Sequence, residues 1–204
     1  MKFIGTLLTL FLTLTSTLSA PIAEEGAEDV SAASLKRVVF PNYLVPILQD
    51  DPDTTFPTQY TGDVSYNGPS AGNEWRLLVG FDVPANVGTR CSIKFRLPMK
   101  EDDVGGYEWV VVGSGKLDVW SLKSIIINGG TSWNNKPART TVKPQFVITQ
   151  PLEGGDAMVV GATIPCKGGQ RMDFEVAASR PGLAFFHWFE LTDPQSGITL
   201  NMYT

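Results

Sequence analysis

The sequence predicts an all-β fold, an antiparallel β-sandwich of the jelly-roll type, and three observations support this prediction. Apolar and polar residues alternate along several short segments, which is typical of strands with one buried face. Turn-forming residues separate these segments, and no helical periodicity is found in residues 38–204. Many short strands joined by such turns are typical of a sandwich or a barrel.

Residues 1–20 are expected to be a secretory signal peptide. Lys2 gives a positive start, an apolar stretch follows from Phe3 to Leu14, and small residues lead to Ala20. The apolar stretch is too short for a stable membrane span, although a structural helix at the N-terminus remains an alternative. The C-terminus has no second apolar tail, so no membrane anchor is expected. The sequence thus predicts a secreted protein, extracellular or in the cell wall.

Residues 21–37 are expected to be a pro-region. Four acidic residues lie among Ala, Gly and Ser without apolar periodicity, a composition that cannot bury enough surface to fold. The segment ends at Lys36-Arg37, a dibasic pair of the kind that Kex-type proteases cut, directly before the apolar run that starts at Val38. A charged linker that stays attached is the alternative. Residues 38–204 have the length of a single domain with a real core.

Strands are expected where apolar residues occupy every second position or form a short run: residues 38–48, 75–83, 91–97, 117–121, 146–149, 158–164, 171–176, 183–191 and 198–204. In the segment 171–176, Met172 and Phe174 alternate with Asp173 and Glu175. One polar face on each strand fits antiparallel sheets whose outer side is solvated.

Turns are expected where Gly, Asn or Asp can adopt positive φ: Asn67-Gly68-Pro69, Val104-Gly105-Gly106, Asn128-Gly129-Gly130, Glu153-Gly154-Gly155-Asp156 and Cys166-Lys167-Gly168-Gly169. Cys91 and Cys166 are expected to form one disulfide, because the chain is destined for an oxidising compartment. Two free thiols, or a cysteine that acts as a nucleophile, would be the alternative.

Five segments resemble the DNRLRE-type carbohydrate-binding modules, which are jelly-roll sandwiches: Arg76–Pro84, Cys91–Pro98, Leu117–Leu122, Thr131–Ala138 and Ile198–Thr204. Among them, the Trp-Asn-Asn-x-Pro motif that begins at Trp133 is the most specific. The disulfide and an acidic insertion near Glu101-Asp102-Asp103 depart from the pattern of these modules, which puts sugar binding in doubt.

The paired cysteines, the Phe-x-Leu-Pro strand and the pro-region more closely resemble a fungal family, the ubiquitin-three-binding protein But-two C-terminal domain. The resemblance runs from Val38 to the end and implies a secreted sandwich domain. The family name refers to binding a ubiquitin-like activation enzyme inside the cell. A signal peptide would keep this chain away from that partner, so the partner is not carried over.

Aromatic residues give the candidate ligand-binding sites. Tyr107 and Trp109 follow two glycines and could form a stacking platform beside acidic residues, or else a cross-strand pair. The alternation places Trp120 opposite the apolar face of its strand, so we expect it to be exposed. Trp133, Asn134 and Asn135 could bind a sugar ring and its hydroxyls.

The Trp133-Asn134-Asn135 segment also has a structural interpretation, which we favour: the tryptophan fills the end of the sandwich and the amides hold the turn. The run Phe185–Phe189 must place some of its rings on the outer sheet face. That placement could make a binding strip, but a strand buried on both sides is the expectation.

Catalytic and metal motifs are missing from the sequence. The acidic runs 50–53 and 101–103 do not match a calcium loop and are expected to be solvated. His187 lies in an aromatic strand without a Gly-x-Ser-x-Gly motif anywhere, so it is expected to be structural. No cofactor, metal or catalytic residue is predicted. Whether the chain is an enzyme is left open, and the sequence favours a protein without enzymatic activity.

The leading hypothesis is therefore a secreted, non-catalytic protein associated with the cell wall or with a polysaccharide. The net charge of −5 and the lack of Lys/Arg clusters longer than two exclude nucleic acid and anionic membranes as partners. A secreted protein that binds another protein, as an effector or antigen, is the alternative. A hydrolase or lyase acting on carbohydrate is the third. The sequence indicates no oligomeric state.

Overall fold

The computed structural model describes residues 34–86, 88–99 and 108–204. The described residues all belong to one compact unit. The predicted signal peptide, most of the predicted pro-region, Tyr107 and the acidic run Glu101-Asp102-Asp103 lie outside the described residues. The regular elements of the described part are all strands, which confirms the all-β prediction. No helix long and apolar enough to cross a membrane occurs in these ranges.

The strands are β1 (Leu35–Val39), β2 (Tyr43–Leu48), β3 (Thr61–Tyr66), β4 (Trp75–Asp82), β5 (Arg90–Leu97), β6 (Val110–Gly113), β7 (Lys116–Ser121), β8 (Phe146–Thr149), β9 (Gly155–Asp156), β10 (Met158–Gly161), β11 (Ile164–Pro165), β12 (Arg171–Ala178), β13 (Ala184–Phe189), β14 (Leu191–Thr192) and β15 (Gln195–Tyr203).

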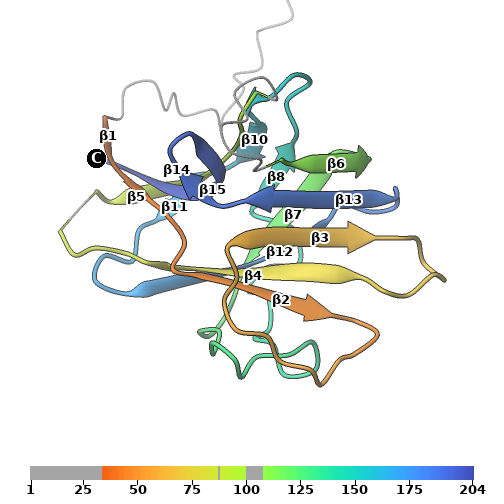
Figure 1. Ribbon diagram of the computed structural model, residues 1–204. Coiled ribbons are helices and arrows are strands. Elements are labelled where there is room, and N and C mark those ends of the chain that lie inside the picture. Colours follow the sequence, from red (N-terminus) through yellow and green to blue (C-terminus); the bar gives the residue numbers. More distant parts are fainter. Residues whose placement is uncertain (1–33, 87, 100–107) are drawn as a thin grey trace, which may run out of the picture. The chain divides into compact units, whose positions relative to one another are not determined.

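Among the described residues these strands form two antiparallel sheets. The six-stranded sheet has the order β1-β15-β5-β11, with β14 beside β15 and β9 beside β5. The nine-stranded sheet has the order β10-β8-β7-β12-β4-β3-β13-β6, with β2 on β4. Figure 1 shows β6, β13, β3, β4 and β2 following one another across the front of the molecule. The predicted antiparallel sandwich is confirmed.

The nine-stranded sheet divides at β4. Strand β12 pairs with β4 over six residue pairs, from Arg171 opposite Asp82 to Val176 opposite Leu77. Strand β3 meets β4 only where Ser65 lies opposite Trp75. We call β7, β8, β10 and β12 the β12 half of this sheet, and β3, β6 and β13 the β13 half. The two halves differ in what covers their outer faces.

The main core lies between the two sheets. Phe95 of β5 meets Trp188 of β13 edge to face, with their ring centroids 5.1 Å apart. Burial of these two large side chains is the main contribution to stability at this contact, and the edge-to-face geometry of the rings adds to it. The predicted disulfide between Cys91 and Cys166 is confirmed, and it closes a loop of 75 residues. On the chain-entropy model, a loop of this length stabilises the fold by about 4 kcal/mol.

A second, smaller core covers the outer face of β2 and β4. Leu122 and Ile126, from the long connection between β7 and β8, pack on Val45, Ile47 and Leu78. The same connection reaches β12, where the backbone N–H of Ile126 donates to Asp173 Oδ2 at 3.1 Å. The prediction of a solvated outer side is therefore wrong for β12, where Glu175 is 1% exposed and Asp173 is 6% exposed. The reason is that alternation reveals which residues are polar but not which loop lies over them.

Three of these strands were not predicted: β3, β6 and the two-residue β9, which lies in the segment 153–156 that was expected to be a turn. Strand β3 contains Gly62 and Asp63, residue types that are depleted in strands. Gly62 is required because a Cβ there would lie 2.0 Å from the ring of Trp188, which packs directly on the backbone. Strand β6 is a short run without alternation. The predicted positive-φ turns are confirmed at these glycines: Gly68, Gly129, Gly154, Gly155 and Gly169.

Candidate functional site

Trp109 serves the fold in the described part of the structure. Its indole Nε1 donates to the carbonyl oxygen of Pro98 at 2.6 Å, and its half-buried ring packs against the main core. Tyr107 lies outside the described residues, so the predicted platform of Tyr107 and Trp109 stays a prediction.

Trp120 is buried, and the prediction that it is exposed is wrong. It is 8% exposed, and the guanidinium of Arg139 lies 3.5 Å from the centre of its ring. The alternation does place Trp120 on the outer face of β7, but Arg139 returns from the long β7–β8 connection and stacks on it. A stacked arginine is a favourable cation–π partner, and it occupies the face that a sugar would need.

Trp133 is also flanked by cations. The charged groups of Arg76 and Lys136 each lie 4.3 Å from the centre of its ring. Lys136 Nζ also donates to the carbonyl oxygen of Trp133 at 2.8 Å. Trp133 packs against the second core, so its ring is engaged on more than one side. This arrangement supports the structural interpretation of Trp133.

The two asparagines of the motif hold the local chain. Asn135 Oδ1 accepts from the backbone N–H of Ser132 at 2.7 Å, and its Nδ2 donates to the carbonyl oxygen of Gly130 at 3.0 Å. Asn134 Nδ2 donates to Asp53 Oδ1 at 2.8 Å. Both amides are thus used within the protein, as expected for residues that stabilise a turn.

A network of ion pairs joins this region to the sheet. Arg76 contacts Glu74 and Glu175, each at 2.8 Å. Arg139 Nε lies 3.0 Å from Glu175, and Arg180 lies 2.6 Å from Glu74. We call these five residues, with Trp120 and Trp133, the arginine–tryptophan cluster. Because both carboxylates are almost fully buried, each depends on its arginines for compensation.

The electrostatics of the cluster favour fixed charges. Burial by itself would raise the pKa of Glu175, but hydrogen bonds and charge from Arg139 and Arg76 outweigh it and hold that pKa below its usual value. A pocket of about 360 Å³ opens beside the cluster, lined by Asp118, Ala177 and Ala178 as well as cluster residues. The lowered pKa favours the ionised form of Glu175, whose carboxylate then compensates the charges of Arg76 and Arg139.

The β13 half has a different outer face. Ala184, Phe186 and Trp188 of β13 point into the core, so Phe185 and His187 point outward. Phe185 is 41% exposed, and Val112, which pairs with it on β6, is 59% exposed. The expectation that this strand is buried on both sides is therefore wrong, because no loop of the described residues covers β13 as the β7–β8 connection covers β12.

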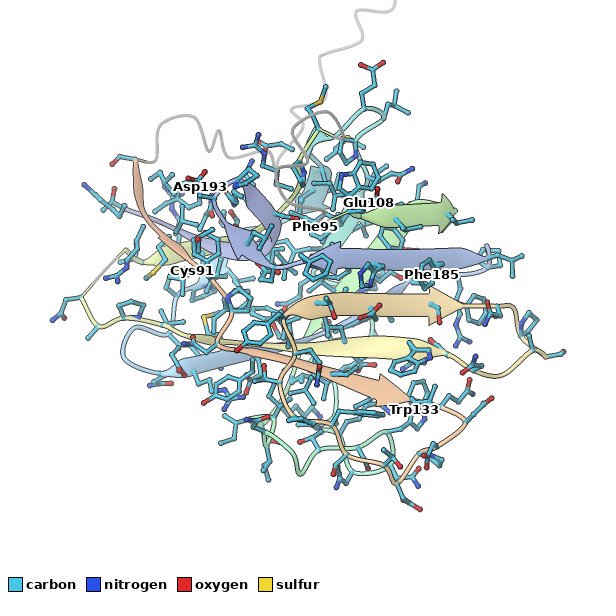
Figure 2. The ribbon with its side chains drawn as sticks, in the orientation of Figure 1. Cys91, Phe95, Glu108, Trp133, Phe185 and Asp193 are labelled. Carbon is cyan, nitrogen blue, oxygen red and sulfur yellow. A yellow bond between two sulfur atoms is a disulfide. The ribbon has the colours of Figure 1, made fainter. Side chains whose placement is uncertain are left out.

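A pocket of about 310 Å³ lies on this face. Its lining consists of Asp63, Val64 and Ser65 of β3, Trp75 of β4 and Phe185 of β13. The strand register brings these residues together, since Ser65 lies opposite both Phe185 and Trp75. In Figure 2, Phe185 lies over β13, far from Trp133, which lies beyond β2. The two regions therefore form separate sites.

A histidine–aspartate pair borders this pocket. His187 Nδ1 lies 2.7 Å from Asp63 Oδ1, and Thr61 Oγ1 donates to Asp63 Oδ2 at 3.0 Å. His187 also meets Phe189 edge to face, with ring centroids 5.6 Å apart. The pair is partly exposed. It places oriented polar atoms beside the aromatic rings, which is a common composition for a binding pocket.

We call the outward residues of the β13 half, together with Trp75, the aromatic face: Asp63, Ser65, Trp75, Val110, Val112, Phe185 and His187. The sequence pointed to it only through the Phe185–Phe189 strip. Asp63, Ser65 and Trp75 were missed, because β3 was not predicted and Trp75, in the predicted strand 75–83, was not singled out as a binding residue. The described residues contain no group of three or more His, Cys, Asp or Glu side chains arranged to hold a metal ion.

The fold and this face define an all-β sandwich domain with an exposed aromatic surface. A family model described as Ubiquitin 3 binding protein But2 C-terminal domain matches residues 39–194. The chain belongs to this family, which confirms the resemblance found in the sequence. No curated protein matches the chain. The resemblance to DNRLRE-type modules stays a prediction.

Proposed function

We propose that the chain is a non-catalytic binding domain that acts outside the cell and holds a cell-wall polysaccharide on the aromatic face. The observation that carries this proposal is the pocket between Trp75 and Phe185, with the polar side chains of Asp63 and Ser65 in its lining. The signal-peptide pattern of residues 1–20 supports an extracellular location.

The chemistry of the face suits a sugar chain. A pyranose ring presents C–H groups on its flat sides and hydroxyls around its edge. Aromatic rings such as Phe185 and Trp75 cover the C–H groups at a low entropic cost. The carboxylate of Asp63 is oriented by Thr61 and His187, so it can accept from hydroxyl groups without first being ordered.

The arginine–tryptophan cluster is the weaker candidate for the same ligand. Arg139 covers the ring of Trp120, and Arg76 and Lys136 flank the ring of Trp133. A sugar could stack there only by displacing cations that also compensate Glu175 or hold the backbone. We therefore assign binding to the β13 half.

Co-sedimentation tests this proposal. The full chain is mixed with a panel of insoluble glucans, chitin and other cell-wall polymers, beside Phe185→Ala and a control, Leu152→Ala, that removes an exposed side chain outside the aromatic face. We expect at least one polymer to retain the wild type and Leu152→Ala but not Phe185→Ala. If no polymer retains the wild type, or if Phe185→Ala is retained equally, the proposal is wrong.

A protein partner is the second candidate. The family membership favours it for a chain that stays inside the cell, where a signal peptide would not separate it from that partner. The family description names binding to ubiquitin 3. The aliphatic side chains of Val110 and Val112 extend the aromatic face, and a contiguous apolar patch of this kind is typical of interfaces. A stoichiometric complex with ubiquitin, seen by light scattering and lost in Val112→Asp, would support this candidate. If the chain and ubiquitin elute from a size-exclusion column as two separate monomers, ubiquitin is excluded as the partner.

A further inference from the structure

We propose that the bond between Arg37 and Val38 is a processing site, cut in the folded chain by an endoprotease selective for paired basic residues. Lys36 and Arg37 are the only two adjacent basic residues in the sequence. A protease with two neighbouring acidic pockets would therefore find one matching position. This inference does not depend on the proposed polysaccharide binding.

The pair lies where the fold leaves it accessible. Strand β1 is at the edge of the six-stranded sheet and, among the described residues, pairs only with β15. The side chains of Leu35, Lys36 and Arg37 are all exposed. An edge strand offers one row of unpaired backbone groups to an incoming chain. It is also already extended, and endoproteases bind peptides in the extended conformation.

The pairing of β1 is interrupted at the pair itself. Leu35 lies opposite Tyr203 and Arg37 lies opposite Met202, so Lys36 has no partner in the register. Such a bulge disrupts the ladder and weakens the residues around it. Upstream, the backbone of Ser34 accepts from Thr204 at the long distance of 3.3 Å. Local opening of residues 34–37 therefore costs far less than global unfolding.

The chain becomes anchored directly after the pair. Val38 is half-buried, and Val39 is 8% exposed and belongs to the main core. Their partners on β15 are Asn201 and Leu200. The family match independently begins at residue 39. The bond between Arg37 and Val38 thus separates the exposed part of β1 from the part that the domain needs.

The reaction is a hydrolysis that needs only water as co-reactant. The C–N bond between Arg37 and Val38 breaks, the hydroxyl of water bonds to the carbonyl carbon of Arg37, and a proton goes to the nitrogen of Val38. The products are a carboxylate at Arg37 and an amine at Val38. Acidic pockets in the protease bind Lys36 and Arg37 through charge-assisted hydrogen bonds.

Limited proteolysis of the full chain under native conditions tests the proposal. The protein is treated with an endoprotease that cuts after paired basic residues, and the products are identified by intact mass and N-terminal sequencing. We expect one cut, a new N-terminus that begins Val38-Val39-Phe40, and a product with an unchanged thermal unfolding temperature. Lys36→Gln and Arg37→Gln should each slow the cut by at least about tenfold, because an acidic pocket loses its partner.

Two controls separate accessibility from sequence preference. Lys116→Gln removes an exposed basic residue elsewhere and should leave the rate unchanged. The same digestion in denaturant measures the rate on the unfolded chain. Absence of the native cut, cleavage only in denaturant, or an equal rate at single basic residues would each overturn the proposal.

Discussion

The two halves of the nine-stranded sheet have the same antiparallel pairing but different outer faces. On the β12 half, the β7–β8 connection covers the strands and buries Glu175 among arginines. On the β13 half, Phe185 and its neighbour Val112 remain exposed. The first face is covered and carries paired charges, and the second is open, with exposed apolar side chains beside polar ones. The comparison teaches that the proposed binding face lies where, among the described residues, no connection returns over the strand.

Glu175→Ala should break the covered face and have the largest effect. The substitution leaves the partly buried guanidinium groups of Arg76 and Arg139 without their shared carboxylate, although Arg76 keeps Glu74, so we expect the free energy of unfolding to fall by about 3 kcal/mol. Chemical denaturation measures this loss. Glu153→Ala, which removes an exposed carboxylate, is the control and should change little. A loss below about 1 kcal/mol for Glu175→Ala would contradict the account of the cluster.

Glu190 follows β13 and should make stability depend on pH. Burial raises the pKa of its carboxyl to about 8, although Ile198 N–H and Trp188 Nε1 donate to it. Its Oε1 is buried without a hydrogen-bond partner among the described residues. Between the usual pKa and this raised one, the unfolded chain releases the proton while the folded chain keeps it. The contribution of Glu190 is therefore fully present at acidic pH and lost as the pH rises to about 8.

Comparing the wild type with Glu190→Gln isolates this effect. From pH 5 to pH 8, the wild type should lose on the order of 3 kcal/mol more of its free energy of unfolding than the variant. Denaturant titrations at both pH values measure the difference. Parallel pH profiles for the two proteins would show that Glu190 ionises normally in the fold.

Gly62→Ala should disturb the inner side of the β13 half. The added Cβ would lie 2.0 Å from the Trp188 ring, so the ring or the backbone must move, at a cost of about 1–3 kcal/mol. Gly168→Ala is the matched control, because its nearest heavy atom is 3.5 Å away. Thermal unfolding compares the two variants. Equal unfolding temperatures would mean that the contact between Gly62 and Trp188 is not tight.

Phe185→Ala should have the smallest effect on stability, although it removes the centre of the aromatic face. The ring is 41% exposed, so its loss should lower the free energy of unfolding by about 1 kcal/mol or less. Denaturation of the variant beside the wild type checks this value. A loss as large as that of Glu175→Ala would indicate that Phe185 belongs to the core.

Much of the fold followed from periodicity, and the site did not. The alternation at Met172, Phe174 and Val176 identified a core strand, because a sheet with one apolar face must bury it. The same alternation misjudged Trp120 and Glu175. Whether an outward residue is exposed depends on a connection more than ten residues away, and no local pattern encodes that.

The aromatic face shows a second limit of sequence reasoning. Phe185 and His187 could be placed outward from their spacing alone. Asp63 and Trp75 join them only through the register of β3 with β13 and β4. Because glycine has a low strand propensity, Gly62 kept β3 from being predicted. The residue must be glycine because the Trp188 ring occupies the space of a Cβ. Contacts between distant strands, rather than local preference, assemble this site.

The most direct test of the account is to map the bound ligand by NMR. A soluble oligosaccharide derived from a polymer that retains the protein in co-sedimentation is titrated into the isotopically labelled chain. The chemical shifts of the backbone amides are followed. The account predicts that the largest shifts cluster at Asp63, Ser65, Phe185 and His187, with the arginine–tryptophan cluster unaffected. Shifts centred on Trp133 or Trp120 instead, with the β13 half unchanged, would contradict it.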